Sequence, residues 1–422
     1  MTGNVLLHPQ TPRYSTPRTN PERQPPVHYD PPAIKNQRLA GNTRPSQIDM
    51  IHRHLAPPLI TSYLGNSSCQ NSITALCERT IGIHAARVQT PFITAASRSP
   101  TIDYSELYAA QNVTRTLIKL RCMRNTLHIC SLPDASLYHA ATIHFRLLRC
   151  AAEETKIPDY TRLHLVLRNA IIEHLDGGCV SERTLEQTFT QQGRIKDSNT
   201  LTAHRATMKR LWEEGTICIQ DQSPSWRQEH RTFGLTKNIY GPAIFADKNR
   251  LNAIQDLVLR YFRTFGPATL GDFSWWSGIG KRSAHDAITN AVTCGTLAPT
   301  NINHTQMYYA PEQQSHDDQF ESLDNEVRLL AWEDLYLKAY YETRWRYAPA
   351  EHSKNIFNSI GEARRTILHR GTVIGTWDVN KQGIPISHSL FEPTQRLNRQ
   401  VRDEIRKLAI RLSDHEKPVL ND

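Results

Sequence analysis

Between residues 162 and 240 the apolar positions recur every three or four residues in three successive stretches. This period predicts three helices, RLHLVLRNAIIEHL, SERTLEQTFTQ and TAHRATMKRLWEEG, with a Gly-Gly break between the first two. Two strands, ICIQDQ and RTFGL, are predicted next, on either side of a polar loop that contains a tryptophan. Three helices followed by a strand pair is the element order of a winged helix.

The same order recurs between residues 251 and 310. Three helical stretches, LNAIQDLVLRYFRTFG, TLGDFSWWSGIG and KRSAHDAITNAVTCG, precede two strand-like segments, TLAPTN and TQMYYA, around an Asn-rich turn. In a helix-turn-helix module the last helix enters the major groove, while the wing touches the DNA backbone. Two such units in tandem predict duplicated DNA-reading modules.

The region before these units mixes helical and strand patterns. Residues 73–88 have apolar positions three and four apart, which predicts a helix, and residues 117–130 predict a strand pair or a strand meeting a turn. The segment GIHAARVQTPF sets His84, Arg87 and Gln89 into an otherwise apolar frame. Such a polar trio predicts either a functional site or a buried, hydrogen-bonded histidine beside an ion pair.

The two ends of the chain differ from its middle. Residues 1–48 hold nine of the 24 prolines and almost no apolar periodicity. They predict a disordered tail, because too little apolar surface offsets the entropy of ordering the backbone. After an acidic linker that begins at Gln313, strand-like segments at 365–368 and 372–377 flank a tight turn, and an amphipathic helix follows Pro393.

These patterns predict an α+β fold, mainly helical, with tandem winged-helix modules and a C-terminal β-rich part. The expected domains are a Pro-rich tail (1–48), an N-terminal winged-helix-like module (49–160), two winged helices (161–245 and 246–316), and a C-terminal β-rich part with its closing helix (317–422).

Charge narrows the class of partner. The chain has 50 Lys and Arg against 41 Asp and Glu, a formal net charge of +9. This excess favours a polyanion, nucleic acid before an anionic membrane surface. No run of 18 apolar residues occurs, which predicts that the chain has no membrane span.

Cysteine spacing narrows the compartment. Eight cysteines without a CxxC pair or a secretory signal predict reduced thiols in the cytoplasm. Cys122 and Cys130 flank His128, but the apolar residues between them favour packing on a buried strand over a metal site.

Several segments together resemble a known family. They are GIHAARVQTPF, MRNTLH at 123–128, GPAT at 266–269 running into DFSWWSG at 272–278, the stretch from Leu329 to Arg344 with Asp334 and Tyr340, and Gly361-Glu362 leading to Gly375-Thr376-Trp377. DFSWWSG is the most specific of them. Spread over residues 50–412, they resemble the tandem winged-helix DNA glycosylases of the AlkZ and YcaQ type.

The resemblance implies a C-shaped protein of several winged-helix modules, closed by a small β-rich part. Such proteins hold duplex DNA and remove damaged bases, usually N7-alkylated purines or bulky adducts. Some members unhook interstrand crosslinks left by DNA-alkylating antibiotics, so self-resistance to such a metabolite is one role that the resemblance implies.

The family's catalytic motif is glutamine-apolar-glutamine, or glutamine-apolar-aspartate, shortly after a glycine. Gly82 and Ile83 match; His84 falls on the first glutamine, Ala85 on the apolar position and Ala86 on the second polar position. An alanine methyl group neither holds nor deprotonates water, so two interpretations stay open. HAAR marks a variant active site, as in a related HAAR-type subgroup, or the protein is a non-catalytic winged-helix regulator or DNA shield.

Two residues are the candidate catalytic ones, His84 and Gln89. An N7-alkylated purine is already cationic, so its departure needs little activation, and the enzyme's remaining task is to place a water and stabilise a cation. An imidazole with a reference pKa of ~6.5 would orient that water or accept its proton. Gln89 would restore the missing carboxamide if the register shifted. The competing interpretation of His84 is a hydrogen-bonded core residue.

Eight residues are candidates for contacts with double-stranded DNA: Arg87, Arg124, His128, Lys281, Arg282, Ser283, Arg364 and Arg370. The first suits a phosphate beside the lesion. Arg124 and His128 either face DNA or satisfy a buried carboxylate. The three consecutive residues begin the predicted recognition helix, whose N-terminus favours anions. Arg364 and Arg370 border a hairpin turn, which either enters the minor groove or is simply exposed to solvent.

A few further residues complete the expectations. Trp275 and Trp276 are predicted to belong to the core, with contact of one of them to DNA as the alternative, and His285 and Asn290 are predicted to meet base edges. Lys338 has the chemistry of a Schiff-base nucleophile, but on an amphipathic helix it is predicted to be solvated. We therefore expect a monomeric, cytoplasmic, nucleoid-associated and monofunctional glycosylase that needs neither metal nor cofactor.

Overall fold

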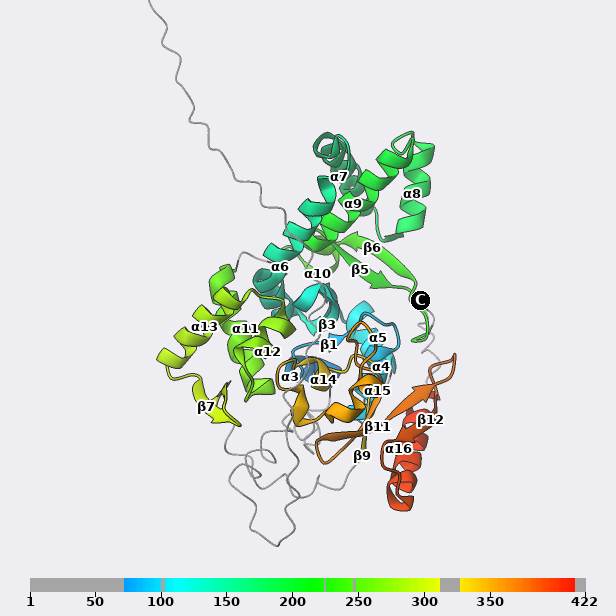
Figure 1. Cartoon of the computed structure of the whole chain (residues 1–422). Helices are drawn as coiled ribbons and strands as arrows, with labels where there is room; N and C mark the ends of the chain where they lie inside the picture. Colours follow the sequence, from blue (N-terminus) through cyan, green and yellow to red (C-terminus); the bar gives the residue numbers. More distant parts are fainter. Residues whose placement is uncertain are drawn as a thin grey trace, which may run out of the picture. The chain divides into compact units, whose positions relative to one another are not determined.

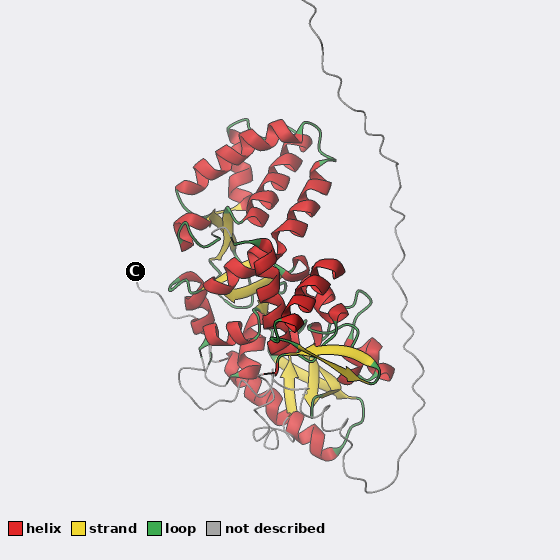
Figure 2. Cartoon of the chain, turned by 90° about the vertical axis from the view of Figure 1, so that its left-hand side faces the viewer, coloured by secondary structure: helices red, strands yellow, loops and turns green. Residues whose placement is uncertain are grey.

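The computed structural model describes residues 72–99, 102, 104–223, 225–245, 248–311 and 327–413 (Figure 1). The tail predicted at 1–48 lies outside the described residues. The fold is α+β and mainly helical, with small antiparallel sheets, as predicted (Figure 2). No described helix is both long and apolar enough to cross a membrane.

The first described part is a three-stranded antiparallel sheet, in the order β1-β3-β2, framed by helices. Its elements are α3 (Ile73–Arg79), β1 (Ile83–His84), α4 (Thr90–Arg98), α5 (Tyr104–Asn112), β2 (Leu117–Arg121), η2 (Met123–Asn125), β3 (Leu127–Ser131) and α6 (Leu132–Glu154).

This part confirms one local prediction and corrects another. The strand pair expected at 117–130 is present as β2 and β3, joined by the short η2 turn. The helix expected over 73–88 is wrong beyond Arg79. Ile81 and Gly82 have φ values of 55° and 83°, and this left-handed backbone ends the helix and turns the chain into β1.

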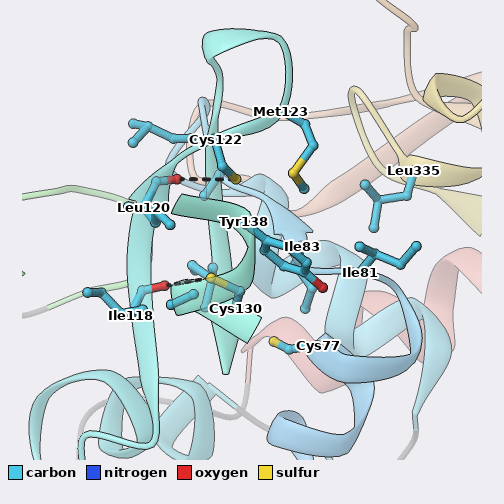
Figure 3. Close-up of a cluster of buried hydrophobic side chains, with 14 of the residues drawn as sticks. Cys77, Ile81, Ile83, Ile118, Leu120, Cys122, Met123, Cys130, Tyr138 and Leu335 are labelled. Atoms are coloured by element: carbon cyan, nitrogen blue, oxygen red, sulfur yellow. Dashed lines mark hydrogen bonds between the residues drawn. The ribbon is translucent and has the colours of Figure 1, made fainter. Parts of the chain in front are cut away.

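A buried cluster joins these strands to a distant segment. Ile81, Ile83 and Met123 belong to the same hydrophobic core as Leu335, which lies more than 200 residues further along the chain (Figure 3). The apolar frame of the HAAR segment is therefore core, as its pattern indicates.

The two cysteines near His128 take part in this packing. The Sγ atom of Cys122 lies 4.0 Å from the Leu120 carbonyl, and that of Cys130 lies 3.8 Å from the Ile118 carbonyl (Figure 3). Burial raises the pKa of Cys122 to about 12, so its thiol stays protonated. Packing on a buried strand pair is what the sequence predicts for them.

The next part has the predicted order of three helices and a strand pair. Its elements are α7 (Tyr160–Asp176), β4 (Val180–Ser181), α8 (Glu182–Gln191), α9 (Ser198–Glu214), β5 (Ile217–Asp221), β6 (Arg231–Leu235) and α10 (Thr236–Tyr240). A capping box between Asp197 and Thr200 starts α9, and Gly215 ends it with a φ of 80°. The strand order of its small sheet is β4-β6-β5.

The second three-helix part follows the same order. It contains α11 (Arg250–Phe265), α12 (Leu270–Ser277), α13 (Lys281–Thr293), β7 (Ala298–Ile302) and β8 (Thr305–Tyr309). The β7-β8 turn uses Asn303 and His304, with φ values of 48° and 61°, as a tight two-residue hairpin requires. Trp276 packs with Tyr261, Phe265 and other aromatic rings, which confirms its predicted place in the core.

The C-terminal part is built on an antiparallel sheet in the order β12-β11-β10-β9. Its elements are β9 (Val327–Leu330), α14 (Leu335–Lys338), η6 (Arg344–Arg346), η7 (Ala350–His352), α15 (Ser353–Ile356), β10 (Thr366–His369), β11 (Thr372–Val379), β12 (Pro385–Leu390) and α16 (Gln395–Ser413). The predicted strand, turn and strand are confirmed as β10 and β11. The closing helix is confirmed as α16 (Figure 1), and its Val401 and Leu408 share a buried cluster with Trp377.

Candidate active site

His84 lies on β1, at an edge of the first sheet. β1 pairs with β3 so that His84 lies opposite His128. Gly82 precedes this strand with a φ of 83°, and a Cβ atom there would lie 3.2 Å from the carbonyl oxygen of Ile129. A glycine is therefore needed for the chain to enter the sheet in the register that sets the two imidazoles side by side.

The His84 side chain is buried and chemically unsatisfied. The residue is 6% exposed, and its ring meets the edge of His128 with the centroids 5.5 Å apart. Its Nδ1 atom is buried without a hydrogen-bond partner among the described residues. Buried polar atoms are almost always paired, so an unpaired imidazole nitrogen indicates a place for a water or a ligand.

The charge state of His84 follows from its surroundings. Burial lowers the pKa of His84 well below its usual range, and the neighbouring basic groups lower it further. These groups are, in order of effect, His128, Lys338, Arg124 and Arg87. His84 is therefore a neutral imidazole near pH 7, with one ring nitrogen free to accept a proton.

His128 is held in place from its own hairpin. Its Nδ1 atom lies 3.2 Å from the Thr126 carbonyl and 3.5 Å from Sγ of Cys122. Burial lowers the pKa of His128 to about 4. The ring is 3% exposed and neutral, so it supports His84 and has little surface left for a DNA phosphate.

A buried Lys-Glu pair lies in the C-terminal part, in the segment that carries Leu335. Lys338 Nζ lies 3.1 Å from Glu333 Oε2, and the two side chains are 10% and 8% exposed. Lys338 also donates to the Gly361 carbonyl at 3.4 Å. The prediction that Lys338 is solvated is wrong, because α14 has only four residues and all of them are buried.

Trp275 connects this pair to the β2-β3 hairpin. The guanidinium carbon of Arg124 lies 3.8 Å from the centroid of the Trp275 ring, and Lys338 Nζ lies 4.9 Å from it. Tyr341 stacks on the same tryptophan at 5.4 Å. The prediction that both tryptophans are core residues needs correction here, since Trp275 is only partly buried and carries cations on its ring.

We call His84, Arg124, His128, Trp275, Glu333 and Lys338 the His84 cluster. Its members come from β1, η2, β3, α12, the residues just before α14 and the last residue of α14. Arg124 and Glu333 have φ values of 50° and 56°. Left-handed backbone at residues other than glycine costs energy and is concentrated at functional sites.

Arg87 lies beside this cluster on the exposed turn after β1. Its guanidinium pairs with Glu362 at 3.1 Å and lies over the Trp332 ring at 4.1 Å. The ion pair expected under the structural interpretation of Arg87 is thus present. The Arg87 side chain is nevertheless 50% exposed, so contact with a phosphate remains open to it.

Gln89 is placed away from the cluster. It precedes α4, and its carboxamide lies against the backbone of Gly383, where a Cβ atom would come within 3.0 Å of it. Among the described residues its side chain makes no hydrogen bond to His84. The geometry gives Gln89 no part in replacing the missing carboxamide.

The remaining predicted DNA contacts lie on α13 and on the segment that leads into the β10-β11 hairpin, both of which border the His84 cluster. Lys281 and Arg282 are exposed at the start of α13. Gly278, just before that helix, lies against Arg124, because a Cβ atom at Gly278 would be 3.2 Å from the Arg124 backbone. Arg364 is exposed next to Ala363, whose amide binds Glu333.

Other candidates lie further along these elements. Ser283 is half-buried in the first turn of α13. Arg370 is exposed in the β10-β11 turn. His285 and Asn290 are exposed on α13.

Sequence reasoning missed Glu333 and Trp332. The available signal was a Trp-Glu-Asp triplet inside the otherwise apolar run LLAWEDLYLK, since acidic residues in such a run are buried only when paired. No group of three or more His, Cys, Asp or Glu side chains suited to a metal occurs within the described ranges.

Comparison with a solved structure identifies the fold first. The fold is similar to that of the Streptomyces sahachiroi DNA glycosylase AlkZ, with a TM-score of 0.64 over 87% of this chain and 97% of that chain, at 19% sequence identity. At this identity the likeness shows a shared fold. No curated protein matches the chain significantly.

The family follows from the sequence itself. The family model described as DNA glycosylase AlkZ-like matches residues 77–414. The chain therefore belongs to the AlkZ-like DNA glycosylase family, as its motifs predict.

Proposed function

We propose that the protein is a monofunctional DNA glycosylase that hydrolyses the N-glycosidic bond of alkylated purines, of the N7 or a bulky type, in double-stranded DNA. The observation that carries the proposal is His84, a buried, neutral imidazole with an unpartnered nitrogen. It stands where the family's catalytic motif begins.

The chemistry fits a neutral imidazole. Loss of an N7-alkylated purine neutralises the base and leaves positive charge on the sugar, so no acid is needed for the leaving group. The attacking water must then give up one proton. A neutral His84 accepts this proton or orients the water, a contribution that is typically about 10²- to 10⁴-fold in rate.

The DNA-binding surface is proposed to include both elements that border the His84 cluster. Arg87 and Arg124 would contact phosphates beside the lesion, and Lys281, Arg282 and Ser283 would hold a phosphate at the start of α13. Arg364 and Arg370 would meet the opposite strand from the β10 hairpin. His128 packs against the His84 ring and is not proposed as a phosphate ligand.

The domain organisation is part of this proposal. The two repeats of three helices and a strand pair are interpreted as winged helices, with α9 and α13 in the place of recognition helices. A role in self-resistance to an alkylating metabolite stays a prediction. A non-catalytic DNA-binding protein is the second candidate, favoured by Ala86 alone.

Single-turnover release of 7-methylguanine from methylated duplex DNA separates the two candidates. We expect release by the parent protein and a loss of about 100-fold or more in His84→Ala, with DNA affinity unchanged. Gln89→Ala is the matched control from the same segment, and its rate is expected to stay within threefold.

Tight binding without release from methylated DNA or from a panel of bulky adducts would establish the non-catalytic alternative. Equal loss in both variants would show that the segment acts through its fold.

A further inference from the structure

A glycosylase with alanine at position 86 lacks a carboxylate in its motif, yet the fold brings another carboxylate to the site. Glu333 Oε2 pairs with Lys338, and Glu333 Oε1 accepts a hydrogen bond from the Ala363 amide at 2.5 Å. The side chain is 8% exposed. A carboxylate so far from water is kept only where its charge is held by partners.

The backbone of Glu333 is fixed on both sides by the helix that follows HAAR. Thr90 of α4 donates to the Trp332 carbonyl at 3.2 Å, and Arg98 of the same helix binds both oxygens of Asp334 at 2.7 and 2.6 Å. Glu333 itself has a φ of 56°. The strained residue is thus the one between two anchors, a pattern that indicates function.

The segment that contains Glu333 packs against the residues around β1 in the hydrophobic core. Leu335, two residues after Glu333, packs in one cluster with Ile81 and Ile83, the residues that flank Gly82 ahead of His84 (Figure 3). The charged ends of Lys338 and Arg124 meet on the Trp275 ring. Lys338, which pairs with Glu333, and Arg124 both lower the pKa of His84, and Glu333 also acts on Arg124. Glu333 and His84 therefore lie near the same two cations.

The His84 cluster has an excess of positive charge, and an anion there would stabilise the positive charge that develops on the sugar. Arg124, Lys338 and the nearby Arg87 are cations, whereas the sugar carries positive charge as the base leaves. Glu362 is already paired with Arg87 and is 29% exposed. Glu333 is the more deeply buried of these two carboxylates, and buried charge acts more strongly on a reacting centre.

We propose that Glu333 is a second catalytic residue of this site and supplies, from another part of the chain, the carboxylate function that is missing at Ala86. This inference rests on the proposed glycosylase function. In the step, the C1′–N9 bond breaks and its electron pair neutralises the cationic purine. The water oxygen bonds to C1′, and its proton passes to Glu333 or His84 and then to solvent.

Lys338 is the positioning residue of the pair. Its ammonium group holds Glu333 Oε2 while the Ala363 amide holds Oε1, so the carboxylate keeps one orientation. Burial raises the pKa of Glu333, and Lys338 opposes this rise. A carboxylate with a raised pKa is a better proton acceptor than a solvated one.

The test is single-turnover base release by Glu333→Gln, with Glu229→Gln as the matched control. Glu229 forms the comparable buried pair with Lys119, its side chain being 10% exposed. Glutamine keeps an acceptor for the Ala363 amide, so a merely structural role predicts lower stability, as for any broken buried ion pair, but little change in the rate of the folded protein. We expect a loss of about 100-fold or more in Glu333→Gln, with DNA affinity within twofold, and a rate within threefold of the parent for Glu229→Gln.

The pH profile gives a signature that a structural role would not produce. The parent rate should fall as the pH drops through the raised pKa of Glu333, and this limb should vanish in Glu333→Gln. If that variant does not fold, Glu333→Asp keeps the charge one methylene further back. It should lose up to about 100-fold and retain the limb.

The outcomes separate the two claims. If the parent releases base and Glu333→Gln releases it equally fast with an unchanged profile, the inference is overturned and the glycosylase stands. If the parent releases no base from any adduct while binding DNA, the proposed function fails, and this inference fails with it.

Discussion

Two buried Lys-Glu pairs in this protein have nearly the same exposure and opposite electrostatics. The side chains of Lys119 and Glu229 are 11% and 10% exposed, and those of Lys338 and Glu333 are 10% and 8% exposed. Burial raises the pKa of Glu229, but Lys119 and Arg231 outweigh burial and the pKa ends below its usual range. Burial wins at Glu333, whose pKa is raised.

The difference lies in the second partner. Glu229 has Arg231 as well, which donates to it at 2.6 Å, whereas a neighbouring carboxylate, Glu362, adds a negative charge near Glu333. A pair with spare positive charge stabilises the fold at neutral pH. At Glu333 one ion pair is opposed by burial and by a second carboxylate, and the raised pKa makes Glu333 a stronger proton acceptor than Glu229.

The largest expected effect comes from removing each lysine. Lys338→Met leaves Glu333 without a cationic ion-pair partner in a buried place and should lower the free energy of unfolding at pH 7 by about 3 kcal/mol. Lys119→Met leaves Glu229 bound to Arg231 and should cost about 1 kcal/mol. Urea unfolding of both variants measures this. Equal losses would show that the two pairs are electrostatically alike.

The pH dependence of stability should differ in sign. The raised folded-state pKa of Glu333 means that the native state holds its proton longer, so its contribution falls as the pH rises from the ordinary carboxyl pKa through the raised one. The lowered pKa of Glu229 means that its contribution is present above the ordinary carboxyl pKa and is lost as the pH falls through the lowered one.

This prediction is checked by urea unfolding between pH 3 and 7. Relative to the parent, Glu333→Gln should steepen the rise of stability with pH, and Glu229→Gln should flatten it. Slopes that change in the same direction would contradict the assigned shifts.

The smallest effect is expected at an exposed pair, Arg87 and Glu362. Arg87→Ala should change stability by less than about 1 kcal/mol, because exposed ion pairs contribute little. If Arg87 meets a phosphate, the slope of log affinity against log salt should fall by about one, uniformly over DNA sequences. Fluorescence anisotropy at several salt concentrations measures the slope, with Lys237→Ala, an exposed lysine on α10, as the control.

Much of the fold could be predicted from the chain alone. Helices α7, α8, α9 and α13 and the pairs β5-β6 and β10-β11 lie where the apolar period and the turn residues place them, because these signals are local. The prediction over 73–88 failed at Ile81 and Gly82. There the register with β3 overrides a helical period.

The candidate site was predicted in half. His84 is a candidate from the sequence because the glycine and the apolar frame around it are readable there, and the family motif falls on the same residues. The roles given to Gln89 and Lys338 did not match their places, since one lies against Gly383 and the other is buried. Exposure of a polar residue depends on what packs over it, and no local pattern records that.

By itself the sequence determined the element order, the core positions and the place of the HAAR segment. Only the tertiary structure decided that Glu333 and Lys338, some 250 residues further along, complete the cluster around His84. The physical reason is that helical and strand periods are set by neighbours within a few residues. The charge state of a buried group is set instead by burial and by partners that the fold brings from anywhere in the chain.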